Sequence, residues 1–278
     1  MKIKLNNGVE MPQIGYGVYQ VSPDECERCV SDALKVGYRM IDTAQAYNNE
    51  EGVGAAIAKC GLPRNELFIV SKIWISNYGY DKARKSIDES LRKLGTDHID
   101  LMLLHQPYCD RYGAYRALED AYKEGKLRAI GVSNFYPDHF IDLAENVEII
   151  PAVNQIETHV FNQQTIARKY MEEFGTRVMS WGPLAEGRNN LFTNPVLEKI
   201  GQKYGKSVAQ VALRWLTQLG IIIIPKSVHI ERMEQNLDIL DFTLSESDMA
   251  EIALLDTGKS LFFDHHDPET VKMFMGWR

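Results

Sequence analysis

Three apolar runs in the first half of the chain each end in a polar residue, namely Asp42, Lys72 and His105. An ammonium group at the end of a buried strand needs a partner, because an isolated charge loses its hydration there. We expect Asp42 to be that partner. Tyr47 lies in the loop after Asp42, and a nearby cation would lower its pKa from about 10 toward the range of an acid catalyst. With His105 orienting a carbonyl oxygen, these residues predict proton donation to an oxygen that becomes an alkoxide.

The elements that must position these residues are short apolar runs that alternate with longer amphipathic stretches. We expect an opening hairpin with strands at 3–5 and 9–11, joined by Asn6-Asn7-Gly8. The runs expected to be strands buried on both faces are 14–19, 39–42, 67–72, 99–105, 127–132, 152–156, 177–181 and 221–225. Amphipathic stretches expected to be helices include 23–36, 81–94 and 208–219.

About eight strand–helix units on one unbroken chain predict a single (β/α)8 TIM barrel over residues 1–278, preceded by the hairpin. In such a barrel the reactive groups gather at the carboxyl ends of the strands. The alternative is a doubly wound parallel sheet. It is disfavoured because Gly15-Tyr16-Gly17 lacks the third glycine of a dinucleotide-binding fingerprint, and no acidic residue follows at the required strand end.

The segment Asp42-Thr43-Ala44-Gln45-Ala46-Tyr47-Asn48-Asn49-Glu50 resembles the Asp-Thr-Ala-x-x-Tyr-x-Asn-Glu signature of the aldo-keto reductases. The resemblance extends over nearly the whole chain, in the order in which the family places its motifs. The further segments that carry it are Ser71-Lys72-Ile73-Trp74, 100–105, Gly131-Val132-Ser133-Asn134-Phe135, Asn154-Gln155-Ile156-Glu157, and Ile224-Pro225-Lys226-Ser227 followed by Arg232 and Asn236.

This resemblance implies a catalytic tetrad of Asp42, Tyr47, Lys72 and His105, and no metal. It implies that NADPH transfers a hydride to the carbon of an aldehyde or ketone while Tyr47 protonates the oxygen. The residues implied in binding NADPH or NADP+ across the barrel mouth are Gly17, Val18, Tyr19, Asp42, Ser133, Asn134, Gln155, Trp181, Gly182, Pro183, Leu184, Lys226, Ser227, Val228, Arg232, Gln235 and Asn236. Those implied in substrate binding are Tyr19, Tyr47, Trp74 and His105.

The sequence departs from the family pattern at three places. Trp181 stands where many members have a tyrosine that stacks on the nicotinamide, and an indole offers an equal or larger face. Gln235 stands where a glutamate is common beside the adenosine. The loop at 106–112 and the tail after Leu261 are short compared with those of the steroid-active members. We therefore expect a small aldehyde, a dicarbonyl or a keto-sugar as substrate.

Composition limits the other partners. The chain has 31 basic and 38 acidic residues, a net charge of −7, which disfavours nucleic-acid binding. Its longest aliphatic run, 221–224, is far shorter than the roughly 20 residues of a membrane span, and the first residues lack a signal peptide's apolar stretch. Four irregularly spaced cysteines favour reduced thiols. We expect a soluble cytoplasmic protein, monomeric or weakly dimeric.

Several other motifs carry weak signals. Cys26-x-x-Cys29 lies inside an expected helix, and Gly258-Lys259-Ser260 lacks the first glycine of a phosphate loop. Asp264-His265-His266-Asp267 has metal-like content, but adjacent residues of an extended segment point to opposite sides, which favours a solvated or tail-packing role. The aromatic residues Phe262, Phe263, Phe274 and Trp277 either pack the tail or reach the rim of the pocket.

Two other functions compete with carbonyl reduction. A Schiff-base aldolase on the same barrel would use Lys72 or Lys226 as its nucleophile, but it leaves Asn134, Gln155 and the cluster around Arg232 unexplained. A reductase-like subunit that binds NADPH and regulates a partner is disfavoured by the intact tetrad. NADPH turnover with an aldehyde would distinguish it from an enzyme.

Overall fold

The computed structural model describes residues 1–278 and places eight parallel strands side by side in one sheet, in chain order. These strands are β3 (Tyr16–Gly17), β4 (Met40–Asp42), β5 (Phe68–Ile73), β6 (Leu101–Leu104), β7 (Ile130–Ser133), β8 (Val153–Glu157), β9 (Arg177–Trp181) and β10 (Ile222–Ile223). A parallel bridge between Ile14 and Ile223 joins the first strand to the last. The sheet therefore closes, and the predicted (β/α)8 barrel is confirmed.

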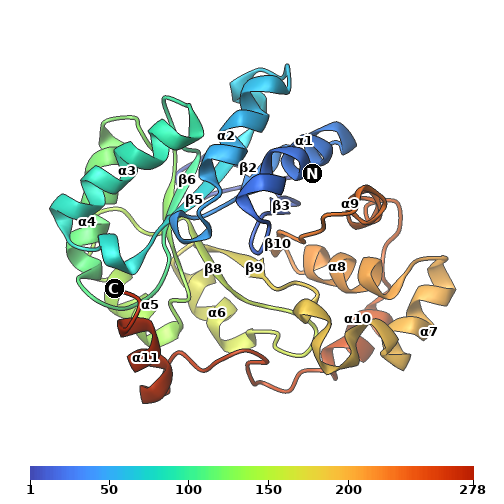
Figure 1. Ribbon diagram of the computed structural model, residues 1–278. Helices are drawn as coiled ribbons and strands as arrows, with labels where there is room; N and C mark the ends of the chain where they lie inside the picture. The colour runs from blue at the N-terminus through green and yellow to red at the C-terminus, as the bar shows by residue number, and fades with distance from the viewer.

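Helices surround the strands in an outer layer (Figure 1). They are α1 (Pro23–Val36), α2 (Glu50–Lys59), α3 (Tyr80–Leu94), α4 (Arg111–Lys123), α5 (Pro137–Ala144), α6 (Thr165–Glu173), α7 (Pro195–Tyr204), α8 (Val208–Gln218), α9 (Ile230–Leu237), α10 (Glu246–Ala253) and α11 (Pro268–Met275). The last helix, α11, lies next to α5, at the lower left of the view. No helix combines the length and the apolar character that crossing a membrane requires.

Local sequence signals set the ends of these helices. Ser22 and Pro23 begin α1 as predicted, although the Ser22 side chain makes no capping bond. Ser207 and Gln210 form a complete capping box at the start of α8. Gly95, with φ 63°, ends α3 in the left-handed conformation that glycine adopts without strain. The three helices expected from periodicity match the structure within about one residue, a margin within which helix ends are commonly assigned.

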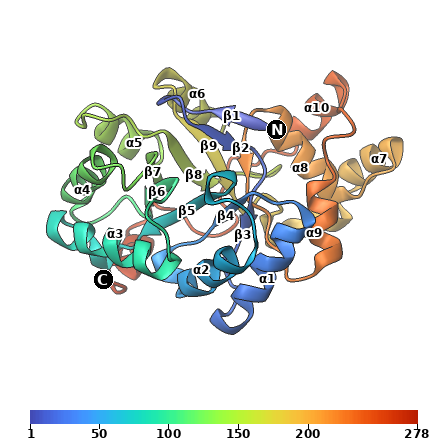
Figure 2. The same cartoon turned by 90° about the horizontal axis from the view of Figure 1, so that it is seen from above.

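The interior of the barrel follows the two-residue period of its strands. Leu5 and Met11, at the hairpin β1 (Lys2–Lys4) and β2 (Glu10–Pro12), pack against the apolar interior side chains and close the amino-terminal end. The hairpin lies beside the start of β9, where Arg177 donates to the carbonyl oxygen of Lys4 (Figure 2). The interior side chains of the same buried cluster are Met40, Phe68, Val70, Leu101, Leu103, Ala129, Ala152, Val153, Met179, Ile222 and Ile224.

The same period points polar side chains into the carboxyl end of the barrel. Asp42 stands two residues after Met40, Lys72 two after Val70, and His105 two after Leu103. Ser133, Gln155 and Trp181 occupy the corresponding positions on β7, β8 and β9. The strands therefore bring these six predicted site residues to one end of the barrel.

Candidate active site

A buried ion pair lies at the centre of the site. The ammonium of Lys72 is 2.6 Å from Oδ1 of Asp42, and the two side chains are 0% and 2% exposed. Lys72 also donates to the carbonyl oxygen of Thr43 at 2.9 Å, and Gln155 donates to Oδ2 of Asp42 at 2.8 Å. Burial lowers the pKa of Lys72 and raises that of Asp42, while the mutual attraction of the charges opposes both shifts. This pairing agrees with the sequence prediction.

Tyr47 lies beside this ion pair, in a short 3₁₀ helix at Gln45–Tyr47. The ammonium of Lys72 donates to its hydroxyl oxygen at 3.4 Å and lies 4.9 Å from the centre of its ring. The expected lowering of the Tyr47 pKa does not appear, because burial raises this pKa well above its usual value, and Asp42 and Tyr19 raise it further. Tyr47 is therefore protonated at neutral pH, which is the form an acid catalyst needs.

Aromatic rings surround His105 at the base of the site. Its ring lies 5.7 Å from that of Tyr47 and 5.0 Å from that of Trp74, both in edge-on contact. Its Nδ1 is buried without a hydrogen-bond partner in the structure. Burial lowers the pKa of His105 well below its usual value, and the nearby Lys72 adds to this shift. A neutral imidazole here can form a hydrogen bond with a carbonyl oxygen.

Asn134 joins the ends of three strands. Its φ of 63° lies in the left-handed region, and its amide donates to the carbonyl oxygen of His105 and to Oγ of Ser133. Its own oxygen accepts the indole N–H of Trp181 at 2.8 Å. In this arrangement Asn134 fixes the plane of the Trp181 ring. The amide nitrogen of Gln155 donates to Asp42 and to the sulfur of Met179, so only its oxygen is available to a carboxamide.

The remaining predicted cofactor residues lie along an arc of the barrel mouth. Val18 is buried and Tyr19 is 51% exposed, with its ring 5.1 Å from that of Tyr47. After β10, which adjoins the first strand where the barrel closes, Lys226 and Arg232 are exposed and make no ion pair, whereas Asn236 on α9 is buried. The arc also contains Gly17 beside β10, Gly182, Pro183 and Leu184 after β9, and Ser227, Val228 and Gln235 near Arg232.

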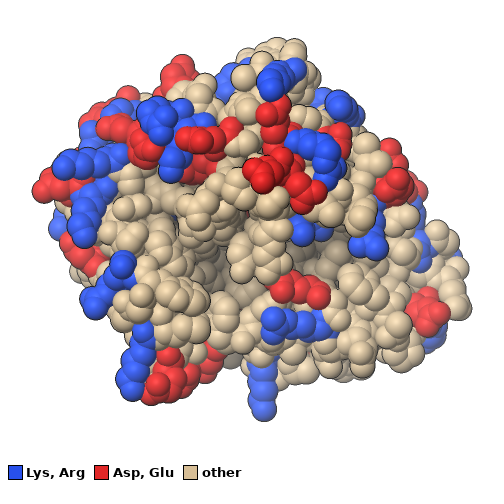
Figure 3. Space-filling model, in the orientation of Figure 1, with Lys and Arg blue, Asp and Glu red and all other residues tan.

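The C-terminal tail, residues 258–278, lies against this mouth. Phe274 and Trp277 pack against Trp74 with ring centres 6.4 and 6.3 Å apart. Phe262 and Phe263 lie with ring centres 5.0 and 6.3 Å from that of Trp181. The four tail aromatics, left open by the sequence, thus contact residues of the site. Uncharged atoms surround the hollow near the centre of this face, and charged side chains lie farther out and just below it (Figure 3).

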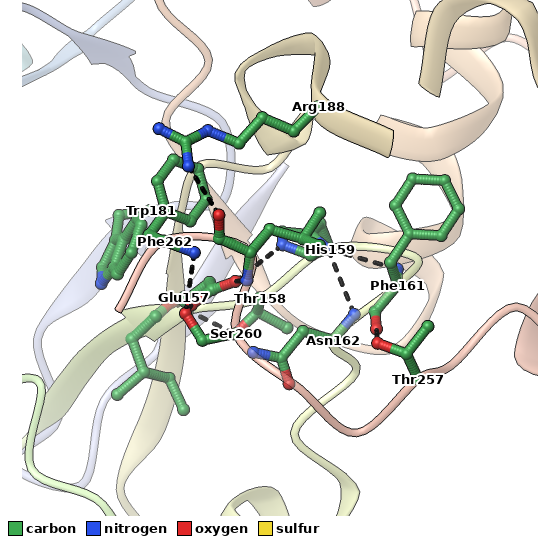
Figure 4. A network of polar contacts seen from close by, with 12 residues as sticks. Glu157, Thr158, His159, Phe161, Asn162, Trp181, Arg188, Thr257, Ser260 and Phe262 are labelled. Carbon is green, nitrogen blue, oxygen red and sulfur yellow. Dashed lines mark hydrogen bonds and ion pairs between the residues drawn. The ribbon is translucent and has the colours of Figure 1, made fainter. Parts of the chain in front are cut away.

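A buried carboxylate that sequence reasoning missed anchors this tail. Glu157, at the end of β8, accepts hydrogen bonds from Oγ of Ser260 at 2.5 Å and from the backbone N–H of Leu261 at 2.9 Å (Figure 4). His159 lies 2.9 Å from the same carboxylate, and Arg188 donates to the carbonyl oxygen of Leu261. The one sequence signal for Glu157 is its place two residues after Gln155. The two-residue period of a strand puts both side chains on the inner face of the barrel.

Comparisons with known proteins agree with this architecture. Residues 5–256 match the family model described as the aldo/keto reductase family. A glyoxal reductase of Bacillus subtilis is 47% identical over 255 residues, which are 91% of this chain and 92% of that protein. The methylglyoxal reductase DkgA of Escherichia coli is 42% identical over 262 residues, 93% of this chain and 94% of that protein.

Solved structures give the same result. An aldo-keto reductase from a deep-sea metagenome library superposes with a TM-score of 0.93 at 42% identity, covering 95% of this chain and 98% of that one. An aldo-keto reductase of Bombyx mori in complex with NADP gives 0.90 at 33% identity, covering 98% and 96%. The chain belongs to the aldo/keto reductase family. The predicted class of enzyme, an NADP-dependent oxidoreductase acting on carbonyl groups, is confirmed.

Proposed function

We propose that this enzyme uses NADPH to reduce small aldehydes and α-dicarbonyls to alcohols, with Tyr47 as the proton donor. The observation that carries the proposal is the chain of contacts from Asp42 through the buried Lys72 to the hydroxyl oxygen of Tyr47, at 2.6 and 3.4 Å.

The residues present fit the cofactor. Lys226 and Arg232 are exposed cations without carboxylate partners at the start of α9, and phosphate groups of NADPH would satisfy them. At the other end, Trp181 offers a partly exposed indole face whose plane Asn134 fixes. Ser133, Asn134 and Gln155 would hold the carboxamide there. When bound, NADPH supplies the hydride.

The protein's own residues would handle the proton. Because Lys72 donates to the oxygen of Tyr47, the hydroxyl proton of Tyr47 is free to point toward a carbonyl oxygen. As that oxygen gains negative charge, the proton moves to it from Tyr47. The ammonium of Lys72, which Asp42 holds in place, would stabilise the phenolate left behind. His105 would orient the carbonyl oxygen from the opposite side.

The substrate class follows from the tail and from the relatives. The tail presents aromatic rings of Phe274 and Trp277 to Trp74, which lies at the catalytic His105, and this wall favours a small substrate. Two relatives that match most of the chain are named glyoxal and methylglyoxal reductases. A Schiff-base role for Lys72 is disfavoured because its ammonium already contacts three oxygens and is 0% exposed.

The test is turnover of NADPH by the purified full chain with methylglyoxal, glyoxal, a simple aldehyde and a keto-sugar, followed by loss of nicotinamide absorbance. Tyr47→Phe removes one hydroxyl, and losing a positioned general acid costs about 10²–10⁴ in rate. Tyr80→Phe is the matched control, because the hydroxyl of Tyr80 donates to the carboxylate of Asp120 on the outside of the barrel. Near-normal turnover by Tyr47→Phe would contradict the donor assignment. A wild-type enzyme inactive on every carbonyl of the panel would contradict the substrate class.

A further inference from the structure

Two neighbouring histidines of the tail point to opposite sides. His265 is buried, with Nε2 3.1 Å from the side-chain oxygen of Gln106. His266 is exposed, and its Nδ1 lies 3.5 Å from a carboxylate oxygen of Asp138. His265 and His266 therefore face opposite sides as expected, but residues 264–267 form a turn, in which the N–H of Asp267 donates to the carbonyl oxygen of Asp264 at 3.2 Å, and not an extended segment. One of these histidines packs the tail, and the other meets α5.

The contact of His266 with α5 brings three metal-binding side chains together. The ligand atoms of Asp138, His139 and His266 all lie within 4.8 Å of one another. The rings of His139 and His266 are stacked, with centres 5.8 Å apart and planes inclined by 17°. Asp138 and His139 belong to the first turn of α5. His266 comes just before α11, which lies next to α5 (Figure 1). The cluster thus joins two segments more than 120 residues apart in sequence.

Two imidazoles and one carboxylate form a donor set suited to Zn²⁺ and similar divalent ions. Three protein ligands leave a fourth tetrahedral position for water. We propose that Asp138, His139 and His266 form a transition-metal site that fastens the C-terminal tail to α5. The site is separate from the catalytic centre and supplies no group to the reduction.

A neighbouring cation limits how tightly this site can bind. Arg111 lies with Nη1 3.0 Å from Nδ1 of His139, and it also donates to the carbonyl oxygen of Pro107 and pairs with Asp142. A metal ion bound to Nδ1 of His139 must displace Arg111 from this nitrogen. The contacts of Arg111 with Pro107 and Asp142 can still hold its guanidinium. We therefore expect reversible binding that responds to the free metal concentration.

Metal binding at this site would restrain the part of the tail that lines the proposed substrate pocket. His266 lies two residues before α11, and this helix places Phe274 against Trp74. Trp74 in turn contacts His105. An ion at the cluster would hold the entrance to α11 on the barrel and slow the detachment of the tail.

The binding test uses the full chain without an affinity tag, freed of metal by a chelator, in a Cys109→Ser background because the exposed Cys109 thiol also binds soft metals. Co²⁺ and Zn²⁺ are titrated alone, with equilibrium dialysis and the visible absorption of Co²⁺ as readouts. We expect one ion per chain, and binding weakened about tenfold or more by His266→Ala or His139→Ala. His98→Ala is the control, because it removes a histidine–carboxylate pair with Asp97 elsewhere on the surface.

A second measurement tests the fastening of the tail. Zn²⁺ should slow proteolytic cleavage within 258–278 in the Cys109→Ser protein and have no such effect in its His266→Ala variant. The metal site is wrong if no ion binds, or if His266→Ala binds as tightly as its parent. Binding that leaves the cleavage rate unchanged would overturn the role in holding the tail. None of these results depends on the catalytic residues or the substrate.

Discussion

The strand ends of the barrel and the C-terminal tail build the same site in different ways. Asp42, Lys72 and His105 stand on neighbouring parallel strands, and the backbone ladder sets their spacing. The tail has no ladder of its own, and side chains such as Glu157 and Arg188 hold it to the barrel. The proposed chemistry thus lies on the rigid part of the molecule, and the proposed substrate wall lies on a part held by side-chain packing and polar contacts.

This difference separates two kinds of variant. A change at a strand end leaves a buried charge or a missing proton, so we expect large losses of stability or of kcat. A change in the tail loosens a wall, so we expect smaller losses that appear mainly in KM.

Replacing Lys72 with methionine should have the largest effect. It leaves the carboxylate of Asp42 buried without its cation, and breaking a buried pair in this way typically costs about 3–5 kcal/mol of unfolding free energy. It should also raise the pKa of Tyr47 further and suppress reduction at neutral pH. Denaturant unfolding and NADPH turnover measure the two effects. Lys59→Met is the control, because its exposed pair with Glu27 is worth about 0–1 kcal/mol.

The partner variant Asp42→Asn should reduce turnover less than Lys72→Met, because it leaves the cation beside Tyr47. The loss of turnover in the double variant should be much smaller than the product of the losses in the two single variants, since both residues act through the hydroxyl of Tyr47. Fluorescence titration should still detect NADPH binding in all three. Independent, multiplicative losses of turnover would refute a single unit acting through Tyr47.

Glu157→Gln should release the tail and change how stability depends on pH. Burial alone would raise the pKa of Glu157, but hydrogen bonds from His159, Ser260 and Leu261 outweigh it and lower this pKa below 4.5. The charged form therefore contributes stability above pH 4.5, and this contribution is lost as the pH falls through the lowered pKa. Losing hydrogen bonds to a charged group should cost about 1.5–3 kcal/mol at neutral pH.

The measurement for Glu157 is urea unfolding of both proteins between pH 7 and pH 3. The difference in unfolding free energy between wild type and Glu157→Gln should become smaller below pH 4.5. Glu198→Gln, at an exposed position on α7, should leave the curve unchanged. A gap that stays constant down to pH 3 would show that the charge of Glu157 does not contribute to holding the tail.

The same division explains how far the sequence could predict the molecule. Apolar runs and the two-residue period placed Asp42, Lys72 and His105 at one end of a barrel, because backbone geometry alone brings such residues together. The tail could not be placed in this way. Its contacts with Glu157, Trp74 and Asp138 join residues more than 100 positions apart, and no local pattern encodes them. The raised pKa of Tyr47 was also missed, because it depends on how deeply the ring is buried.

Arg232→Ala should weaken NADPH binding by about ten- to hundred-fold and leave NADH nearly unchanged. Arg232 is exposed on α9 without a carboxylate partner, and the cofactors differ only by the 2′-phosphate. A charge-assisted contact is worth about 1.5–3 kcal/mol, and about 1.4 kcal/mol is tenfold in affinity. Fluorescence titration with both cofactors measures the ratio, and Arg214→Ala on α8 is the control. Equal losses for the two cofactors would mean that Arg232 supports the fold instead.

Trp277→Ala should have the smallest effect, on the tail side of the comparison. The indole is 51% exposed and packs against Trp74 at 6.3 Å, and an aromatic pair contributes about 0.5–1.5 kcal/mol beyond its buried area. Since about 1.4 kcal/mol is tenfold, KM for an aldehyde should rise about two- to ten-fold. The value of kcat should stay near that of the wild type, because Trp277 touches neither Tyr47 nor Lys72. The hydrogen bond from the indole of Trp74 to the backbone carbonyl of residue 277 does not depend on the side chain of that residue, so the tail should keep its place.

Steady-state kinetics with methylglyoxal measure KM and kcat separately. A fall in kcat as large as that of a strand-end variant would show that the tail orients the reacting groups, and the division between a catalytic barrel and a substrate wall would be wrong.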